Sequence, residues 1–239
     1  MDSPASAGAN THEAVIEAAR KINAPAMRAV QQAADTLVDL AERIVEATAD
    51  GHQVFAFGAG HADMFAMELY SRAGGLRLCQ IMHLTDLDPQ KRPFGMQMRD
   101  SEPERDPANG AELIRHYGIA NGDIVLIASN SGRNGAAVEL ALRCRDLGAF
   151  TAAFTSVAHS QAVASRHPSG KRLLDVADVV VDNCCPLGDA VLSDPRVNHA
   201  FGATSSLSFC LLAQALNVAV VRTLADRHLP VEVLVSANV

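Results

Sequence analysis

The sequence predicts an α/β fold built around a parallel sheet. Five short apolar runs have the length of strands, and helical stretches fall between several of them. The runs are apolar throughout rather than alternating, which is typical of strands covered on both faces. Strands that alternate with helices indicate βαβ units and therefore a parallel sheet.

The individual elements follow from the same patterns. Glycine clusters close the first strand and the first βα helix. The expected strands cover residues 54–57, 76–84, 123–128, 150–154 and 176–181. The expected helices between and after them cover residues 62–72, 134–147 and 203–226, and an extended tail follows at 231–235.

The N-terminal region has a different composition. Residues 1–10 predict a disordered tail, residues 11–50 predict helices, and residues 51–239 predict the α/β domain. Pro25 is expected to divide the helical region into two helices, because proline removes a helix hydrogen bond. Between residues 30 and 45, apolar side chains recur at three-four spacing. This stripe is suited to packing on the sheet or on a partner subunit.

Two segments interrupt the alternation of strands and helices. Residues 85–110 are rich in proline and charge, and residues 156–172 contain His159, His167 and Lys171. Long irregular connections inside a domain are often lids or binding loops. A simple surface excursion is an equally good interpretation of each segment.

Composition excludes several classes of partner. The net charge is −7 without a basic block, which argues against nucleic-acid binding. The five cysteines show no zinc-type spacing, so we expect reduced thiols, no metal and no cofactor. The first ten residues do not resemble a signal peptide, and no apolar run approaches the roughly 20 residues that span a bilayer. We therefore expect a cytoplasmic protein without membrane association.

Polar residues follow three of the expected strands. The first strand ends in Gly58-Ala59-Gly60-His61, the third in residues 129–134, and the fifth in residues 182–189. In an open parallel sheet, ligands bind beyond the carboxyl ends of the strands. We therefore expect these three segments to meet at one edge of the domain and to form the binding site.

The segment after the third strand has the chemistry of a phosphate site. Gly132 allows a tight turn, and the following helix offers unpaired backbone N–H groups with positive partial charge. Hydroxyl and amide side chains surround that glycine. The expected phosphate-binding residues are Ser129, Asn130, Ser131, Gly132, Arg133 and Asn134. The alternative is that serine and asparagine only cap the helix.

Two better-known nucleotide motifs do not fit. The lysine of a Walker loop is absent after Gly132. Gly58-Ala59-Gly60 is only part of a dinucleotide fingerprint, because Asp63 stands where a third glycine belongs.

The stretches FAFGAGHADMFAMELYSRAGGL and IVLIASNSGRNGAAVELA resemble the sugar isomerase (SIS) family of phosphosugar-binding domains. The similarity extends from about residue 12 to the end, and is closest to a stand-alone SIS group with GAGH and SNSGRN motifs. It implies a flavodoxin-like α/β/α sandwich with a five-stranded parallel sheet, and a homodimer or homotetramer with sites at subunit interfaces. It also implies that Ser129 and Ser131 bind phosphate.

The resemblance implies a glutamate base on the helix after the first strand, and Glu68 is the matching residue. His61 is a plausible proton donor to the substrate carbonyl. An ion pair between Glu68 and Arg72 is the structural alternative. Weaker candidates for substrate contact are Gly60, His167, Lys171, Asn183, Asp189 and Ser205.

Three functions remain open at this point. The first is a cofactor-free isomerase that interconverts aldose and ketose phosphates by glutamate-mediated proton transfer. The second is a non-catalytic sugar-phosphate sensor. The third is a lyase or etherase acting on an amino-sugar phosphate with the same acid–base groups.

Overall fold

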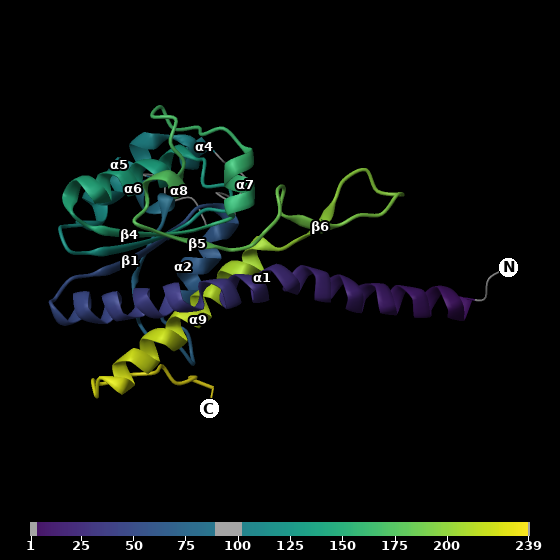
Figure 1. Cartoon of the computed structure of the whole chain (residues 1–239), viewed down its shortest axis with the longest axis horizontal. Helices are drawn as coiled ribbons and strands as arrows, with labels where there is room; N and C mark the ends of the chain where they lie inside the picture. The colour runs from purple at the N-terminus through teal and green to yellow at the C-terminus, as the bar shows by residue number, and fades with distance from the viewer. Residues whose placement is uncertain (1–3, 89–101, 239) are drawn as a thin grey trace.

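Five parallel strands form the central sheet, in the order β2-β1-β3-β4-β5 (Figure 1). The computed structural model describes residues 4–88 and 102–238. The strands are β1 (Val54–Gly58), β2 (Gln80–Met82), β3 (Ile124–Ala128), β4 (Phe150–Thr155) and β5 (Val179–Asp182). The predicted α/β fold with a five-stranded parallel sheet is confirmed.

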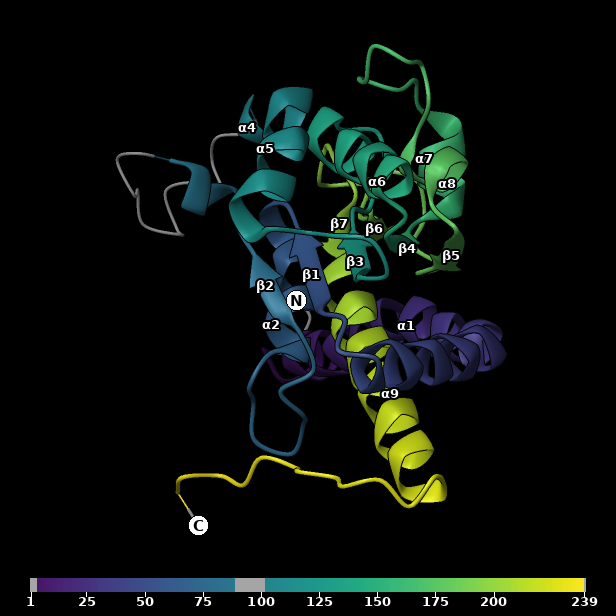
Figure 2. The ribbon, with the colours of Figure 1, turned by 90° about the vertical axis from the view of Figure 1, so that its left-hand side faces the viewer.

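Helices cover both faces of the sheet, so the domain has three layers (Figure 2). One face carries α1 (Pro4–Ala49), α2 (Asp63–Leu69) and α9 (Ser205–Asp226), and its core includes Leu37, Phe65 and Phe209. The other face carries α4 (Glu102–Arg105), α5 (Pro107–Tyr117), α6 (Gly135–Leu147) and α8 (Leu173–Val176). The core on that side includes Leu113, Val138 and Val176. The short α7 (Val157–Ala162) follows β4.

The expectation that Pro25 divides the N-terminal region is wrong. Pro25 lies inside one continuous helix, α1, which already begins at Pro4 within the expected tail. Ala26 and Ala29 beside it are fully buried. An internal proline costs a helix about 3 kcal/mol, and the burial of these side chains against the domain favours the helix through this position. The N-terminal half of α1 extends well beyond the body of the domain (Figure 1).

Helix α9 is more apolar than we expected from the sequence, in which no apolar run approached the length of a membrane span. Its 22 residues have a mean hydropathy of 1.6 in the most apolar window, which is long and apolar enough to cross a membrane. The helix instead packs against α1 and α2, and Phe209, Leu212 and Leu216 are buried there. A core helix of a folded domain meets the same criteria, so α9 gives only weak evidence for a membrane span.

Several elements differ from the sequence expectations. An antiparallel hairpin of β6 (Ala190–Leu192) and β7 (Phe201–Ala203) was not predicted, and it projects beside α1 (Figure 1). Helix α5 lies partly in the expected irregular segment, where Asp106 caps it by accepting a hydrogen bond from the Ala108 N–H. The centre of that segment, residues 89–101, lies outside the described residues.

The start of the fifth strand also differs from the expectation at 176–181. Val176 ends α8, in which the Asp175 carboxylate accepts the Arg172 N–H at the beginning of the turn, and β5 begins at Val179. The tail at 231–235 is not a sheet strand. It is held at one residue, where Leu234 exchanges backbone hydrogen bonds with Gly74 and Gly75.

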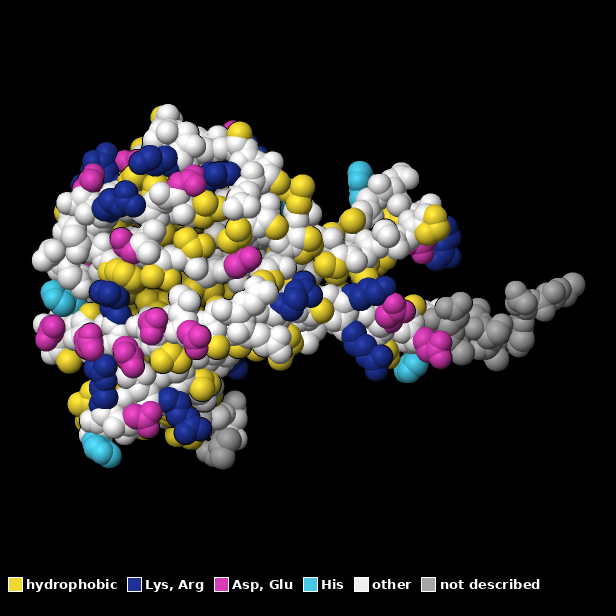
Figure 3. Space-filling view, viewed as in Figure 1, with side chains coloured by type: hydrophobic (Ala, Val, Ile, Leu, Met, Phe, Trp, Pro, Cys, Tyr) yellow, Lys and Arg dark blue, Asp and Glu magenta, His cyan; other side chains and the backbone are white. Residues whose placement is uncertain are grey.

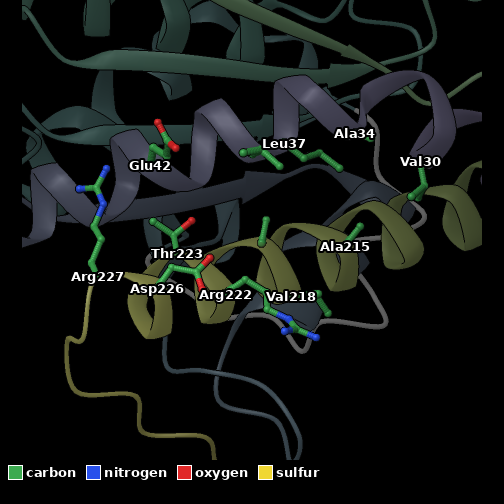
Figure 4. Close-up of a pocket in the computed structure, with 12 residues that line it drawn as sticks. Val30, Ala34, Leu37, Glu42, Ala215, Val218, Arg222, Thr223, Asp226 and Arg227 are labelled. Atoms are coloured by element: carbon green, nitrogen blue, oxygen red, sulfur yellow. The ribbon is translucent and has the colours of Figure 1, made fainter.

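An apolar groove of about 620 Å³ runs between α1 and α9 (Figure 4). Val30 and Leu37 line it from α1, and Ala215 and Val218 line it from α9. Acidic side chains form a row along the C-terminal half of α1 on the surface shown in Figure 3. The groove is therefore apolar at its centre and bordered by charge.

Candidate active site

The carboxyl ends of β1, β3 and β4 lie side by side. Ala128 is level with Gly58 on one side and with Phe154 on the other. After β1 the chain turns into a 3-10 helix, η1 (Gly60–Ala62), which places His61 in solvent. Gly58 permits this turn, since a Cβ there would lie 2.4 Å from the Ala62 carbonyl oxygen. Thr155 of β4 is level with Asp182 of β5, so the polar ends of the first, third and fifth strands lie along one sheet edge as expected.

The loop after β3 depends on Gly132. This residue has φ +58°, and a Cβ on it would lie 2.9 Å from Ser160 Oγ and 3.0 Å from Thr155 Oγ1. The Gly132 N–H donates to the Ser129 carbonyl at 3.2 Å, which closes the turn. Ser129 is 8% exposed and Ser131 is half-buried. The loop thus approaches α7 closely, and a larger residue at position 132 is excluded.

Asn183 supports the loop from β5. Its side chain is fully buried, and its Nδ2 donates to Asn130 Oδ1 at 2.8 Å. Its Oδ1 accepts the Cys185 N–H at 3.0 Å. The Ser156 N–H donates to the Asn130 carbonyl at 3.0 Å. Asn183, a weaker candidate for sugar binding, is therefore engaged at both ends of its amide in holding the site together.

The segment after α7 folds over the loop. The Leu173 N–H donates to the Gly132 carbonyl at 2.7 Å, and the Arg166 N–H donates to the Arg133 carbonyl at 2.9 Å. His167 does not face the loop, because its ring nitrogens contact Glu139 Oε2 and Ser169 Oγ, each at 2.8 Å. Lys171 is exposed.

Asn134 occupies the N-cap position of α6 but does not cap it. Its backbone is extended, and its side chain makes no hydrogen bond to the first turn of the helix. Instead, Asn134 Oδ1 accepts from Arg166 Nη1 at 2.8 Å, and the side chain also bonds Glu104. The alternative interpretation, in which Asn134 caps the helix, is therefore not what the structure shows. Within the described residues, the Asn134 side chain leaves the first amides of α6 uncapped.

Positive charge gathers at this uncapped helix end. The pKa of Arg166 is lowered, first by burial and then by the nearby positive charges of Arg133 and Arg105, while Glu104 opposes the shift. Arg133 Nε is buried and has no hydrogen-bond partner among the residues that the structure describes. Arg105 and Arg166 were not among the site residues predicted from the sequence. Only the placement of Arg166 inside the suspected binding loop at 156–172 pointed to it.

Asp189 and Ser205 hold the start of α9. Asp189 Oδ1 accepts the N–H groups of Thr204 at 3.0 Å and Ser205 at 2.7 Å. Asp189 Oδ2 accepts the Ser205 hydroxyl at 2.6 Å. The structure thus brings these two weaker candidates together as a helix-capping pair.

Glu68 contacts two residues on the α2–α9 side of the sheet. Its Oε1 accepts from Gln214 Nε2 of α9 at 2.6 Å and also from Arg72 one helical turn away. The side chain is 18% exposed. The ion pair considered as the structural alternative is therefore present. Glu68 lies seven residues beyond His61, or about 10 Å along a helix axis.

Two further polar groups at this edge were not among the predicted site residues. The pKa of His159 in α7 is lowered by burial, and its ring faces the charges of Asp189 and Arg133. His83, the residue after β2, lies 3.2 Å from the carboxylate of Asp63, which is 3% exposed. This close carboxylate raises the pKa of His83 against the opposing effect of burial. Histidine and carboxylate separated by twenty residues give no local signal in the sequence.

Comparison with family models shows the family to which the chain belongs. The model described as the SIS domain matches residues 18–156, which is more than half of the chain. This chain belongs to the SIS domain family. The match includes β1, β3, β4 and the loop at 129–134.

Relatives of this SIS-domain chain span most of its length. A UPF0309 protein of Halalkalibacterium halodurans is 39% identical over 199 residues, covering 83% of this chain and 81% of the relative. A UPF0309 protein of Geobacillus kaustophilus is 31% identical over 220 residues, covering 92% and 86% respectively.

Solved SIS-fold structures resemble the chain in architecture. A phosphoheptose isomerase of Neisseria gonorrhoeae has a TM-score of 0.58 at 16% identity, covering 88% of this chain and 98% of its own. A phosphoheptose isomerase of Francisella tularensis has a TM-score of 0.52 at 15% identity, covering 92% and 98%. At these identities the likeness concerns the fold alone.

Proposed function

We propose that this SIS-domain chain binds a sugar phosphate and interconverts its aldose and ketose forms without a cofactor. The observation that carries the proposal is the uncapped start of α6 beside Arg133, at the carboxyl edge of the sheet. Unpaired helix amides together with arginine charge suit a phosphate monoester. The phosphoheptose isomerases that share the fold support the same substrate class.

In this proposal the loop at 129–134 holds the ester group. The hydroxyls of Ser129 and Ser131 and the backbone N–H groups after Gly132 donate hydrogen bonds to phosphate oxygens. Arg133 adds charge, and Arg105 nearby raises the local positive potential. Binding at the phosphate supplies energy that is remote from the reacting carbons and orients them.

Glu68 is the proposed base. Aldose–ketose interconversion moves a proton between adjacent carbons through an enediol, so one carboxylate can remove the proton and return it. The hydrogen bond from Gln214 fixes the position of the Glu68 carboxylate. His61 at the exposed β1 turn is the proposed donor to the carbonyl oxygen. The polar groups of α7 and α9 form the remaining wall of the site.

A second copy of the chain is part of the proposal. Val38 is 48% exposed and Val218 is 59% exposed, and both line the apolar groove between α1 and α9. Burial of such side chains against an equivalent surface stabilises a homodimer. We place the assembled protein in the cytoplasm, where sugar phosphates are found.

The experiment is hydrogen exchange at the carbon next to the carbonyl. The wild-type protein is incubated in deuterated water with a panel of aldose and ketose phosphates, and deuterium incorporation is followed by NMR. We expect incorporation with one member of the panel and its loss in Glu68→Gln. Asp194→Asn, a change in an exposed ion pair on the hairpin connection, is the matched control and should retain exchange.

The outcome also separates the enzyme from a sensor. Tight binding of a sugar phosphate without deuterium incorporation would show a binding module and would refute the isomerase. Binding that survives Ser131→Ala unchanged would remove the loop from the site.

A further inference from the structure

Asn134 stands in the position of a helix cap while its side chain is held elsewhere. The backbone at Asn134 has φ −77° and ψ 143°, the extended conformation in which an N-cap asparagine accepts an N–H from the first turn. Asparagine is among the most favourable residues at this position. The missing cap bond therefore needs a cause outside α6.

The cause lies in two charged residues on either side of Asn134. Arg166 Nη1 donates to Asn134 Oδ1 at 2.8 Å, which occupies the oxygen that a cap bond requires. Glu104 in α4 bonds the same side chain. Arg166 is itself fixed, because its backbone N–H donates to the Arg133 carbonyl at 2.9 Å. Both ends of the amide are thus engaged away from the helix.

Capping by Asn134 and binding of a phosphate would compete for the same donors. The first-turn amides of α6 have no partner within the helix. If the Asn134 oxygen accepted from them, an anion would lose those hydrogen bonds. Arg133 Nε is buried next to Asn134 and has no partner within residues 4–88 and 102–238, so a second donor at this point is available.

We propose that Arg166 is a positioning residue, which holds the Asn134 side chain off the start of α6 and so keeps the helix amides free for the phosphate. The inference rests on the proposed phosphate site and adds a regulatory contact to it. The donor that keeps the site open comes from the segment after α7, so the order of that segment controls anion affinity. Glu104 contributes from the opposite side.

The test is a double-mutant comparison of Arg166→Leu with Arg166→Leu/Asn134→Ala. In the single variant Asn134 is released and caps α6, so the Kd for inorganic phosphate should rise about tenfold relative to wild type. In the double variant no side chain is left to compete, so most of that affinity should return. Calorimetric titration measures each Kd.

Thermal unfolding supplies the second readout. The Tm of the single variant should exceed that of the double variant by about 2 to 4 °C, since only the single variant can form the cap. The single variant is thus expected to bind phosphate more weakly than the double variant and to unfold at a higher temperature. Arg143→Leu, which removes an exposed arginine from the same helix, is the charge control and should leave the Kd within twofold.

The measured Kd and Tm values distinguish the proposed role of Arg166 from other roles. If the double variant binds phosphate as weakly as the single variant, Arg166 acts through its charge or through the fold, and the inference is wrong. The inference is also wrong if the variant with the higher Tm is the one that binds phosphate more tightly. If wild-type protein does not bind phosphate, or if Ser131→Ala binds it as tightly as wild type, the phosphate site itself is wrong and both proposals fall.

Discussion

Asn183 Nδ2 lies 2.8 Å from Asn130 Oδ1, and this bond joins the end of β5 to the loop after β3. The two residues are 53 positions apart in the chain. The Asn183 side chain is fully buried, so water cannot replace this hydrogen bond if it is lost. The proposed phosphate loop is consequently supported from a strand two places away in the sheet.

Asn183→Ala is expected to lower the free energy of unfolding by about 1–3 kcal/mol, because it leaves the Cys185 N–H and the Asn130 oxygen unpaired. It should also weaken phosphate binding by loosening the loop. Chemical denaturation and calorimetric titration measure the two effects. Thr48→Ala, which removes a side-chain hydrogen bond to the Ile44 carbonyl near the end of α1, is the control. Unchanged phosphate affinity in Asn183→Ala would contradict the support role.

Gly132→Ala should destabilise the protein more than Gly60→Ala. Both glycines have φ close to +60°, so both substitutions impose similar backbone strain of about 1–2 kcal/mol. A Cβ at Gly60 meets open space, whereas a Cβ at Gly132 meets the Ser160 and Thr155 hydroxyls. Denaturant unfolding of the two variants isolates the contribution of those contacts. Equal losses of stability would show that the contact with α7 is not tight.

His83→Gln should reduce stability more in acid than in base. The Asp63 bond raises the pKa of His83 above its ordinary value near 6.5, so the folded protein binds this proton more strongly than the unfolded chain. The stabilisation is fully present below about pH 6.5 and is lost as pH rises through the folded pKa. We expect a difference from wild type of about 1–3 kcal/mol near pH 6 and less near pH 9.

Urea unfolding at the two pH values provides the measurement for His83. His116→Gln changes an exposed histidine in the same surface pocket and serves as the control. A pH-independent effect of His83→Gln would mean that the contact with Asp63 does not couple to protonation.

Val218→Glu should dissociate the proposed homodimer. The side chain is 59% exposed in the single chain and lines the α1–α9 groove, so a carboxylate there is tolerated by the monomer and disfavoured in an apolar interface. Sedimentation velocity should show a change from dimer to monomer. Val235→Glu, at an 82% exposed position in the C-terminal tail, should leave the sedimentation coefficient unchanged. A wild-type monomer would refute the interface directly.

Local sequence patterns were enough to predict the fold and the position of the loop. The apolar runs at β1, β3 and β4 were predicted within two residues, because fully buried parallel strands leave an unbroken apolar signature. Gly132 was identified as the turn that lets the loop tighten, and its positive φ agrees. The hairpin of β6 and β7 was missed because β6 is half-buried and β7 is largely exposed, so both lack that signature.

The sequence by itself determined a parallel α/β sheet with hydroxyls, amides and glycine at the mouth of its central strand. It did so because burial and turn chemistry are encoded by neighbouring residues. Only the tertiary structure decided which polar groups meet there: that Arg166 occupies the oxygen of Asn134, that Asn183 supports Asn130, and that Asp63 holds His83. These contacts join residues twenty or more positions apart, and their partners are chosen by strand order and packing rather than by spacing along the chain.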